Sequence, residues 1–125
     1  MDIVISQKQA GVPVTIFRVR ERINLGNAEE LVQKAQEAFA GGMRHLILDL
    51  SEVDSITSAG LRAIHRIYKL LEVKPASGEA VGGCSSSYLK LVNPTPEVRR
   101  TMNIVGFDTF MDILDTEQAA LAAFG

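Results

Sequence analysis

The stretch HLILDLSEVDSITSAGLRAIHRIYKLL, from His45 to Leu71, decides the fold of this 125-residue chain. It starts with a short and almost wholly apolar run, Leu46–Leu50, which is typical of a strand buried on both faces. A loop rich in hydroxyl groups follows. From Ser58 onward apolar residues recur every three or four positions, which predicts an amphipathic helix. A buried strand that leads into such a helix indicates an α/β fold.

The start of this predicted helix is the chemically distinctive point of the chain. Thr57, Ser58 and the backbone N–H groups of Ala59, Gly60 and Leu61 are expected there. Unpaired donors and a partial positive charge make a helix N-terminus tolerant of an anion. A phosphate could arrive as a ligand or as a modification of a hydroxyl group. A simpler explanation also stands, in which Ser58 caps the helix as an ordinary N-cap residue.

The segments before this stretch predict a hairpin and a helix. Two strands are expected, Ile3–Ser6 and Val12–Val19. The second strand is apolar on both faces and should therefore be central in the sheet. Asn27 is expected to cap the first helix, with Glu30 completing a capping box.

The segments after Leu71 predict a loop and four further elements. Val73–Ser87 is rich in Pro, Gly and Ser and is expected to be a long loop. A strand at Tyr88–Val92, a helix introduced by Pro96, a strand at Thr109–Leu114 and a C-terminal helix should follow. Strands and helices alternate after the opening hairpin, so the sheet should be mixed.

Composition argues against several classes of function. The formal net charge is −2 and the basic residues are dispersed, so no direct contact with nucleic acid is expected. Cys84 is the only cysteine, which favours a reducing compartment. The first residues lack the pattern of a signal peptide, and no apolar run approaches about 20 residues. We therefore expect a cytoplasmic protein that does not insert into membranes.

Three rival sites have weaker support. Asp49 ends a buried strand, as in a phosphorylated receiver domain, but the acidic pair and the lysine of a receiver are missing, so Asp49 should bond the loop backbone. His45 and His65 have no partners at metal-ligand spacing, so no metal site is expected. Gly82–Ser87 lacks the Gly-Lys-[Ser/Thr] ending of a phosphate loop, so no nucleotide cofactor is expected.

Two segments, DLSEVDSITSAGL (Asp49–Leu61) and LKLVNPTPEVRRTMNIVGFDTFMDI (Leu89–Ile113), resemble a STAS domain of the anti-sigma-factor antagonist type. The similarity extends from the opening hairpin to the last helix. It implies a single STAS domain over residues 1–125, with a mixed sheet of four to five strands flanked by about four helices.

The resemblance also implies a function without catalysis. Members of this branch bind a serine kinase that is also an anti-sigma factor, which phosphorylates one serine and thereby releases the antagonist. A serine phosphatase reverses the modification. Ser58 matches that serine, because Ser58-Ala59-Gly60-Leu61 aligns with the family's Ser-[Ser/Thr/Ala]-Gly-Leu. Thr57 stands where many antagonists have Asp, and it is the alternative acceptor.

Unmodified Ser58 is then expected to cap the helix within a mostly neutral contact surface. The residues expected to contact the partner are Asp54, Ser55, Ile56, Thr57, Ala59, Gly60, Leu61 and Arg62. A weak homodimer is left open. One rival is an unphosphorylated STAS scaffold, or a subunit of a signalling or membrane-transport assembly. Another is a nucleotide-binding protein or enzyme, against which the missing P-loop argues.

Overall fold

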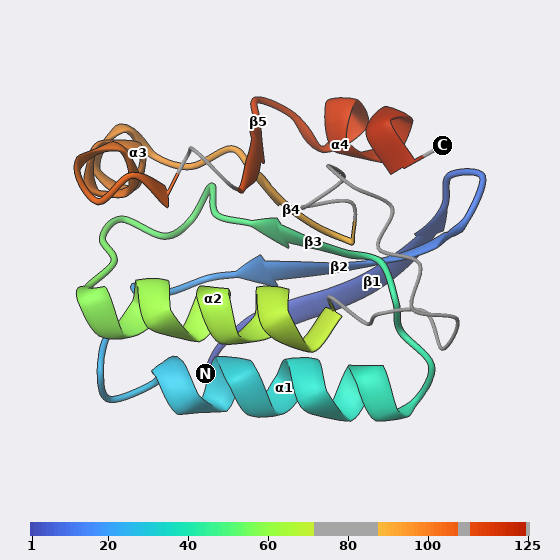
Figure 1. Ribbon diagram of the computed structural model, residues 1–125, viewed down its shortest axis with the longest axis horizontal. Helices are drawn as coiled ribbons and strands as arrows, with labels where there is room; N and C mark the ends of the chain where they lie inside the picture. The colour runs from blue at the N-terminus through green and yellow to red at the C-terminus, as the bar shows by residue number, and fades with distance from the viewer. Residues whose placement is uncertain (72–87, 108–110, 125) are drawn as a thin grey trace.

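Five strands form one mixed sheet in the computed structural model, which describes residues 1–71, 88–107 and 111–124 (Figure 1). The elements in chain order are β1 (Ile3–Gln9), β2 (Pro13–Val19), α1 (Ala28–Ala40), β3 (Leu46–Asp49), α2 (Ser58–Leu71), β4 (Leu89–Val92), α3 (Pro96–Ile104), β5 (Asp112–Leu114) and α4 (Glu117–Phe124). The strands lie side by side in sequence order. β1 and β2 are antiparallel and every later pair is parallel, which confirms the predicted α/β fold with a mixed sheet.

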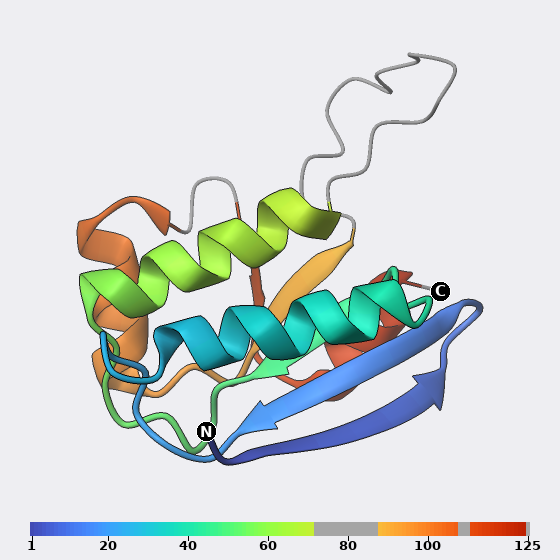
Figure 2. The same ribbon diagram turned by 90° about the horizontal axis from the view of Figure 1, so that it is seen from below.

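The helices cover the two faces of the sheet unequally. α1 and α2 pack beside each other on one face (Figure 2), and the main core lies beneath them. Fully buried members of this core include Phe17, Leu48, Ile64 and Leu91. On the other face the short α4 covers a smaller core around Ile16, Ile47 and Ala120. The central place of β2, between β1 and β3, follows from its two apolar faces as predicted.

The loops that follow the parallel strands meet at one edge, which we call the carboxyl end of the sheet. The backbone N–H of Ile23 donates to the carbonyl of Ser55 at 3.2 Å, and the N–H of Thr57 donates to the carbonyl of Ile23 at 3.0 Å. The Thr95 hydroxyl, at the start of α3, donates to the carbonyl of Val53 at 2.8 Å. These bonds join loops that are far apart in sequence, and they fix the backbone on which α2 begins.

The capping box predicted for α1 is wrong. The Asn27 side chain accepts no bond from its own helix, and its oxygen accepts instead from the N–H of Asn24 at 2.9 Å. Its amide group donates to Glu21 and to the carbonyl of Arg22. Glu30 pairs with the amino group of Met1 rather than with the start of the helix. Asn27 stands at the N-cap position as predicted, and its carbonyl accepts from the N–H groups of Glu30 and Leu31 at 3.1 and 3.4 Å. Its side chain, however, bonds the loop that returns from β2.

The structure confirms the expectation for Asp49 and corrects the expected start of the last strand. Asp49 bonds the loop backbone as predicted, because its carboxylate accepts from the N–H of Ser51 at 3.0 Å. The last predicted strand is shorter than expected and begins at Asp112. The predicted loop Val73–Ser87, with Cys84 and the rejected phosphate loop inside it, lies outside the described residues.

The described residues contain no group of three His, Cys, Asp or Glu side chains that could hold a metal ion. Within the same ranges, every helix is too short or too polar to span a bilayer.

Candidate functional site

The hydroxyl groups of Thr57 and Ser58, at the start of α2, have different surroundings. Thr57 is the N-cap: its hydroxyl oxygen accepts from the N–H of Gly60 at 3.4 Å, and its carbonyl accepts from the N–H of Leu61 at 3.0 Å. Ser58 is the first residue of the helix and is exposed. Within the described part of the chain its hydroxyl group has no hydrogen-bond partner. The expectation that Ser58 itself caps the helix is therefore wrong, because Thr57 already fills that position.

Gly60 is required where it stands for reasons of packing. A Cβ atom at this position would lie 2.6 Å from Cγ1 of Ile56, 2.8 Å from Cγ2 of Ile23 and 3.0 Å from the carbonyl oxygen of Ile23. The last two contacts belong to the loop after β2. The first turn of α2 can thus rest directly on that loop only if residue 60 has no side chain. The glycine of the Ser-Ala-Gly-Leu segment thus helps to fix the position of Ser58.

The residues predicted to contact a partner divide into two groups by exposure. Ile56, Gly60 and Leu61 are buried and support the loop from beneath. The residues with solvent-exposed or partly exposed side chains are Asp54, Ser55, Thr57, Ser58, Ala59 and Arg62. The structure therefore brings the predicted residues together at one place, and it separates those that hold the loop from those that a partner could reach.

A second loop, not foreseen from the sequence, completes this surface. A shallow depression of about 430 Å³ is lined by Asn24, Leu25, Gly26, Thr57, Ser58, Ala59 and Arg62. Leu25 has 83% of its surface exposed, although it is a large apolar residue. The available signal in the sequence was an apolar residue between two turn-forming residues, Asn24 and Gly26. That signal alone does not reveal that this loop lies beside Ser58.

The charges around the depression are mostly paired. Arg22 pairs with Asp54 at 3.4 Å, and Arg66 pairs with Glu29 at 2.8 Å. The hydrogen bond to Glu29 and its negative charge raise the pKa of Arg66. Arg62 lies between these pairs along the surface and makes no ion pair with any described residue. The depression therefore has one unbalanced positive charge, one turn of helix beyond Ser58.

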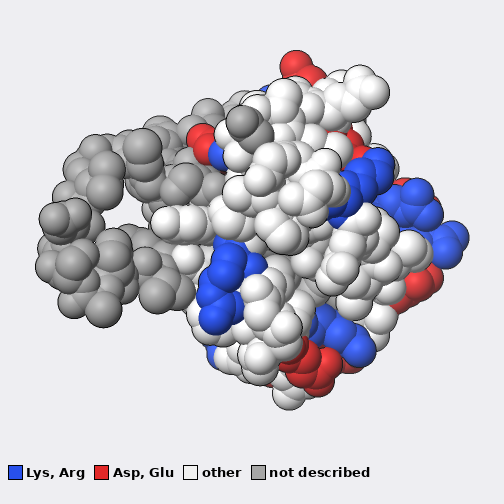
Figure 3. Space-filling model, turned by 90° about the vertical axis from the view of Figure 1, so that its right-hand side faces the viewer, with Lys and Arg blue, Asp and Glu red and all other residues white. Residues whose placement is uncertain are grey.

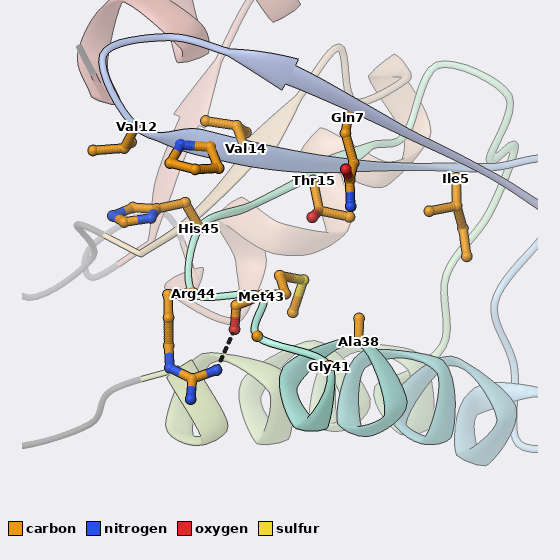
Figure 4. Close-up of a pocket in the computed structure, with 12 residues that line it drawn as sticks. Ile5, Gln7, Val12, Val14, Thr15, Ala38, Gly41, Met43, Arg44 and His45 are labelled. Carbon is orange, nitrogen blue, oxygen red and sulfur yellow. Dashed lines mark hydrogen bonds between the residues drawn. The ribbon is translucent and has the colours of Figure 1, made fainter.

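A larger cavity, of about 570 Å³, lies at the other end of the sheet, between the β1–β2 hairpin and the end of α1 (Figure 4). Its basic groups are already engaged. The Arg44 guanidinium donates to the carbonyls of Phe39 and Met43, at 2.9 and 2.7 Å, and lies over the Phe39 ring. The His45 ring packs against Phe124, and burial followed by the charge of a nearby lysine lowers the pKa of His45. On this side of the molecule basic side chains are spread over the surface, and several of them lie beside acidic side chains (Figure 3).

Comparison with known proteins places this arrangement in a family. The sequence pattern of the STAS domain matches residues 4–76. BtrV of Bordetella bronchiseptica, a candidate anti-sigma factor antagonist, is 32% identical over 102 residues, which cover 82% of this chain and 78% of BtrV.

Solved structures of two known proteins illustrate the shared fold. A candidate anti-sigma factor antagonist from Thermotoga maritima has a TM-score of 0.77 at 24% identity and covers 95% of this chain and 91% of its own. The Bacillus antagonist SpoIIAA matches in its unphosphorylated form, with a TM-score of 0.64, 19% identity and 94% and 92% of the two chains covered. Its phosphorylated form matches with a TM-score of 0.62 at 20% identity, over 96% of each chain.

The sheet order, the placement of the helices and the match over more than half of the sequence agree with one another. The 32% identity with BtrV extends over most of this chain. The chain belongs to the STAS-domain family, and BtrV, the Thermotoga maritima protein and SpoIIAA, which it resembles, are named as anti-sigma factor antagonists.

Proposed function

We propose that this protein is an anti-sigma factor antagonist that binds an anti-sigma factor through the start of α2. The partner is also a serine kinase, it phosphorylates Ser58, and a serine phosphatase reverses the modification. The chain acts as one STAS domain over residues 1–125, in the cytoplasm, by binding and not by catalysis. Family membership and the names of the matched relatives support the binding role.

One observation carries the choice of acceptor. The Ser58 hydroxyl group is exposed and has no hydrogen-bond partner among the described residues, whereas the Thr57 hydroxyl group caps the helix. A kinase that modifies Thr57 would act on a hydroxyl group whose oxygen is engaged in the helix cap, whereas a kinase that modifies Ser58 would act on a hydroxyl group without such a bond. SpoIIAA has the same fold, and its structure in a phosphorylated form supports the proposal that this fold can carry a phosphate group.

The proposed switch is local. A phosphate adds about −1.5 to −2 charges. At a helix N-terminus an anion is favoured by roughly 0.3–1 kcal/mol, so the free domain should keep its fold. Against a close-packed partner the same group would have to lose its water without gaining a counter-ion. A hundredfold weaker complex needs only about 2.7 kcal/mol, and desolvation of an unpaired charge readily supplies that.

The test starts from the native complex. Affinity capture from the source cells, followed by mass spectrometry, identifies the partner and the modified residue. The purified partner with ATP should then phosphorylate wild type and Thr57→Val, but not Ser58→Ala. Ser58→Glu should bind the partner at least about a hundredfold more weakly than wild type, while Ser58→Ala binds normally.

Three results would count against the proposal. Phosphate found on Thr57 in the Ser58→Ala variant and in wild type alike would move the acceptor to Thr57. Stable capture in a transport or scaffold complex, with both hydroxyl groups unmodified in bound and unbound fractions, would favour the scaffold function instead. Turnover of ATP or GTP by the isolated domain would point to an enzyme.

A further inference from the structure

The depression beside Ser58 continues as a groove between the starts of α1 and α2. A second hollow of about 120 Å³ shares three lining residues with the first: Leu25, Ala59 and Arg62. The remaining lining residues of this second hollow are Ala28, Glu29, Ala63 and Arg66. We call the two hollows together the Leu25 groove. Its floor consists of small alanine side chains, and Leu25 and Arg62 stand at its border.

The backbone around Leu25 is held by hydrogen bonds of its neighbours, and the Leu25 side chain is exposed. The side chain of Asn24 accepts from the N–H of Gly26 at 2.9 Å, which closes a tight turn around Leu25. The carbonyl of Asn24 accepts from the N–H of Ala28 at 2.9 Å, and the N–H of Asn24 is bound by Asn27. An apolar side chain on such a fixed loop loses little conformational entropy when a partner covers it.

Arg62 supplies the charge that defines the partner's chemistry. The side chain of a helical residue points back toward the helix N-terminus, so Arg62 covers the turn that contains Ser58. Both residues line the same hollow. The acidic groups at the border, Asp54 and Glu29, already have arginine partners. The charge that complements the Leu25 groove is therefore negative, because Arg62 alone is left unpaired in the described part of this surface.

We propose that the Leu25 groove is the specificity-determining part of the contact with the anti-sigma factor. Leu25 enters an apolar recess of the partner, and Arg62 bonds a carboxylate group at the border of that recess. This inference rests on the proposed function, and it names two residues, on two different elements, that select the partner. Neither residue is needed for the fold, because both are exposed.

The test measures the affinity of the purified full chain for the anti-sigma factor identified by capture. Leu25→Ala should weaken binding at least about tenfold, and Arg62→Glu about a hundredfold. Two matched controls should remain within about twofold of wild type. Ile104→Ala removes another large apolar side chain, 75% exposed on α3, and Lys34→Glu reverses another exposed charge on a helix. Circular dichroism and thermal melts should show all four variants folded.

A charge exchange sharpens the result. In the partner, each carboxylate residue that is protected on complex formation is changed to Arg. One of these changes should restore the affinity of Arg62→Glu while weakening that of wild type. Rescue of this kind requires direct pairing, since a general loss of stability in the Arg62→Glu variant would not respond to a change in the partner.

The outcomes separate the inference from the function on which it rests. If wild type binds and Ser58→Glu does not, but Leu25→Ala and Arg62→Glu bind like wild type, the groove inference is overturned and the proposed function stands. If wild type binds no anti-sigma factor, the proposed function is wrong, and the groove inference that rests on it is wrong as well. If Leu25→Ala instead converts a dimer of the free protein to a monomer, the groove accepts a second copy and the inference is overturned.

Discussion

The two ends of the sheet each have a hollow, but the smaller hollow is the better candidate for a binding site. At the amino end of the parallel strands, around Arg44 and His45, the cavity holds about 570 Å³. At the carboxyl end, beside Ser58, the main depression holds about 430 Å³. The larger cavity has basic groups bound to the protein itself. The smaller one presents Arg62, an exposed leucine and a hydroxyl group that has no hydrogen-bond partner among the described residues.

This difference indicates that the side chains available to a ligand are a better guide to a binding site than the volume of the hollow. At the carboxyl end the backbone bonds between Ile23, Ser55 and Thr57 hold the loops together. The exposed side chains of Leu25, Ser58 and Arg62 make no hydrogen bond or ion pair with any described residue. At the amino end the basic side chains are themselves engaged in contacts within the protein, so few of them are available to a ligand.

One glycine from each end gives the largest contrast. Gly60→Ala should lower the free energy of unfolding by roughly 2–3 kcal/mol, because the new Cβ would overlap Ile23 and Ile56. Gly41→Ala should change it by less than about 0.5 kcal/mol, because its Cβ would come no nearer than 3.5 Å to any atom outside its neighbours. Urea denaturation of both variants measures the difference. If both variants lost equally little free energy of unfolding, the carboxyl end would be less tightly packed than described.

The buried lysine near the amino end gives the second contrast. The Nζ of Lys90 lies 2.8 Å from Asp112, and the Lys90 side chain is 6% exposed. Asp112→Ala should cost about 2 kcal/mol, because it leaves a buried charge unpaired. Asp115→Ala removes an exposed pair with Arg99 and should cost less than about 0.5 kcal/mol. Adding Lys90→Met to Asp112→Ala should restore most of the loss, and failure to do so would show that Asp112 stabilises the domain in another way.

The two hydroxyl groups at the start of α2 give the third contrast. Thr57→Ala removes the cap and should lower the free energy of unfolding by about 1 kcal/mol. Ser58→Ala removes a hydroxyl group with no bond in the described structure, so its effect should stay within about 0.5 kcal/mol. Thermal unfolding at one pH compares them. A larger loss for Ser58→Ala than for Thr57→Ala would reverse the assignment of cap and acceptor.

The smallest expected effect is a pH dependence at the amino end. Burial and Lys90 lower the pKa of His45 in the folded state, so the unfolded chain binds the proton more readily. Stability should therefore fall as the pH drops below about 6.5, the ordinary histidine pKa, and level off below the folded pKa. His45→Phe keeps a ring between Tyr88 and Phe124 and should flatten the melting temperature between pH 7 and pH 5.5. An unchanged pH profile in this variant would assign the effect to other groups.

Much of the fold could be predicted because it depends on local patterns. The apolar run Leu46–Leu50 and the three- to four-residue spacing after Ser58 correctly predict β3 and the start of α2. The two apolar faces of β2 correctly predict its central position. Each of these conclusions requires only neighbouring residues, and burial of one face decides the outcome.

The errors arise where distant segments compete for the same groups. The predicted capping box at Asn27 fails because Glu21 and Arg22 fold back within reach of its side chain. The position of the Leu25 loop beside the start of α2 depends on the pairing of residue 23 with residue 56, which no local pattern reveals. The choice between Thr57 and Ser58 as the cap turns on a shift of a single residue, which is within the usual uncertainty of a helix boundary.

The backbone bonds that hold the carboxyl end have an evolutionary consequence. Because main-chain groups of Ile23, Ser55 and Thr57 fix the loops, and Gly60 fixes the helix against them, residues such as Leu25 and Arg62 are free to vary. Duplicated copies of such a domain can therefore acquire different partners through a few surface substitutions, with almost no loss of stability. The same property makes the domain a suitable starting point for engineering insulated signalling pairs that share a cell without cross-talk.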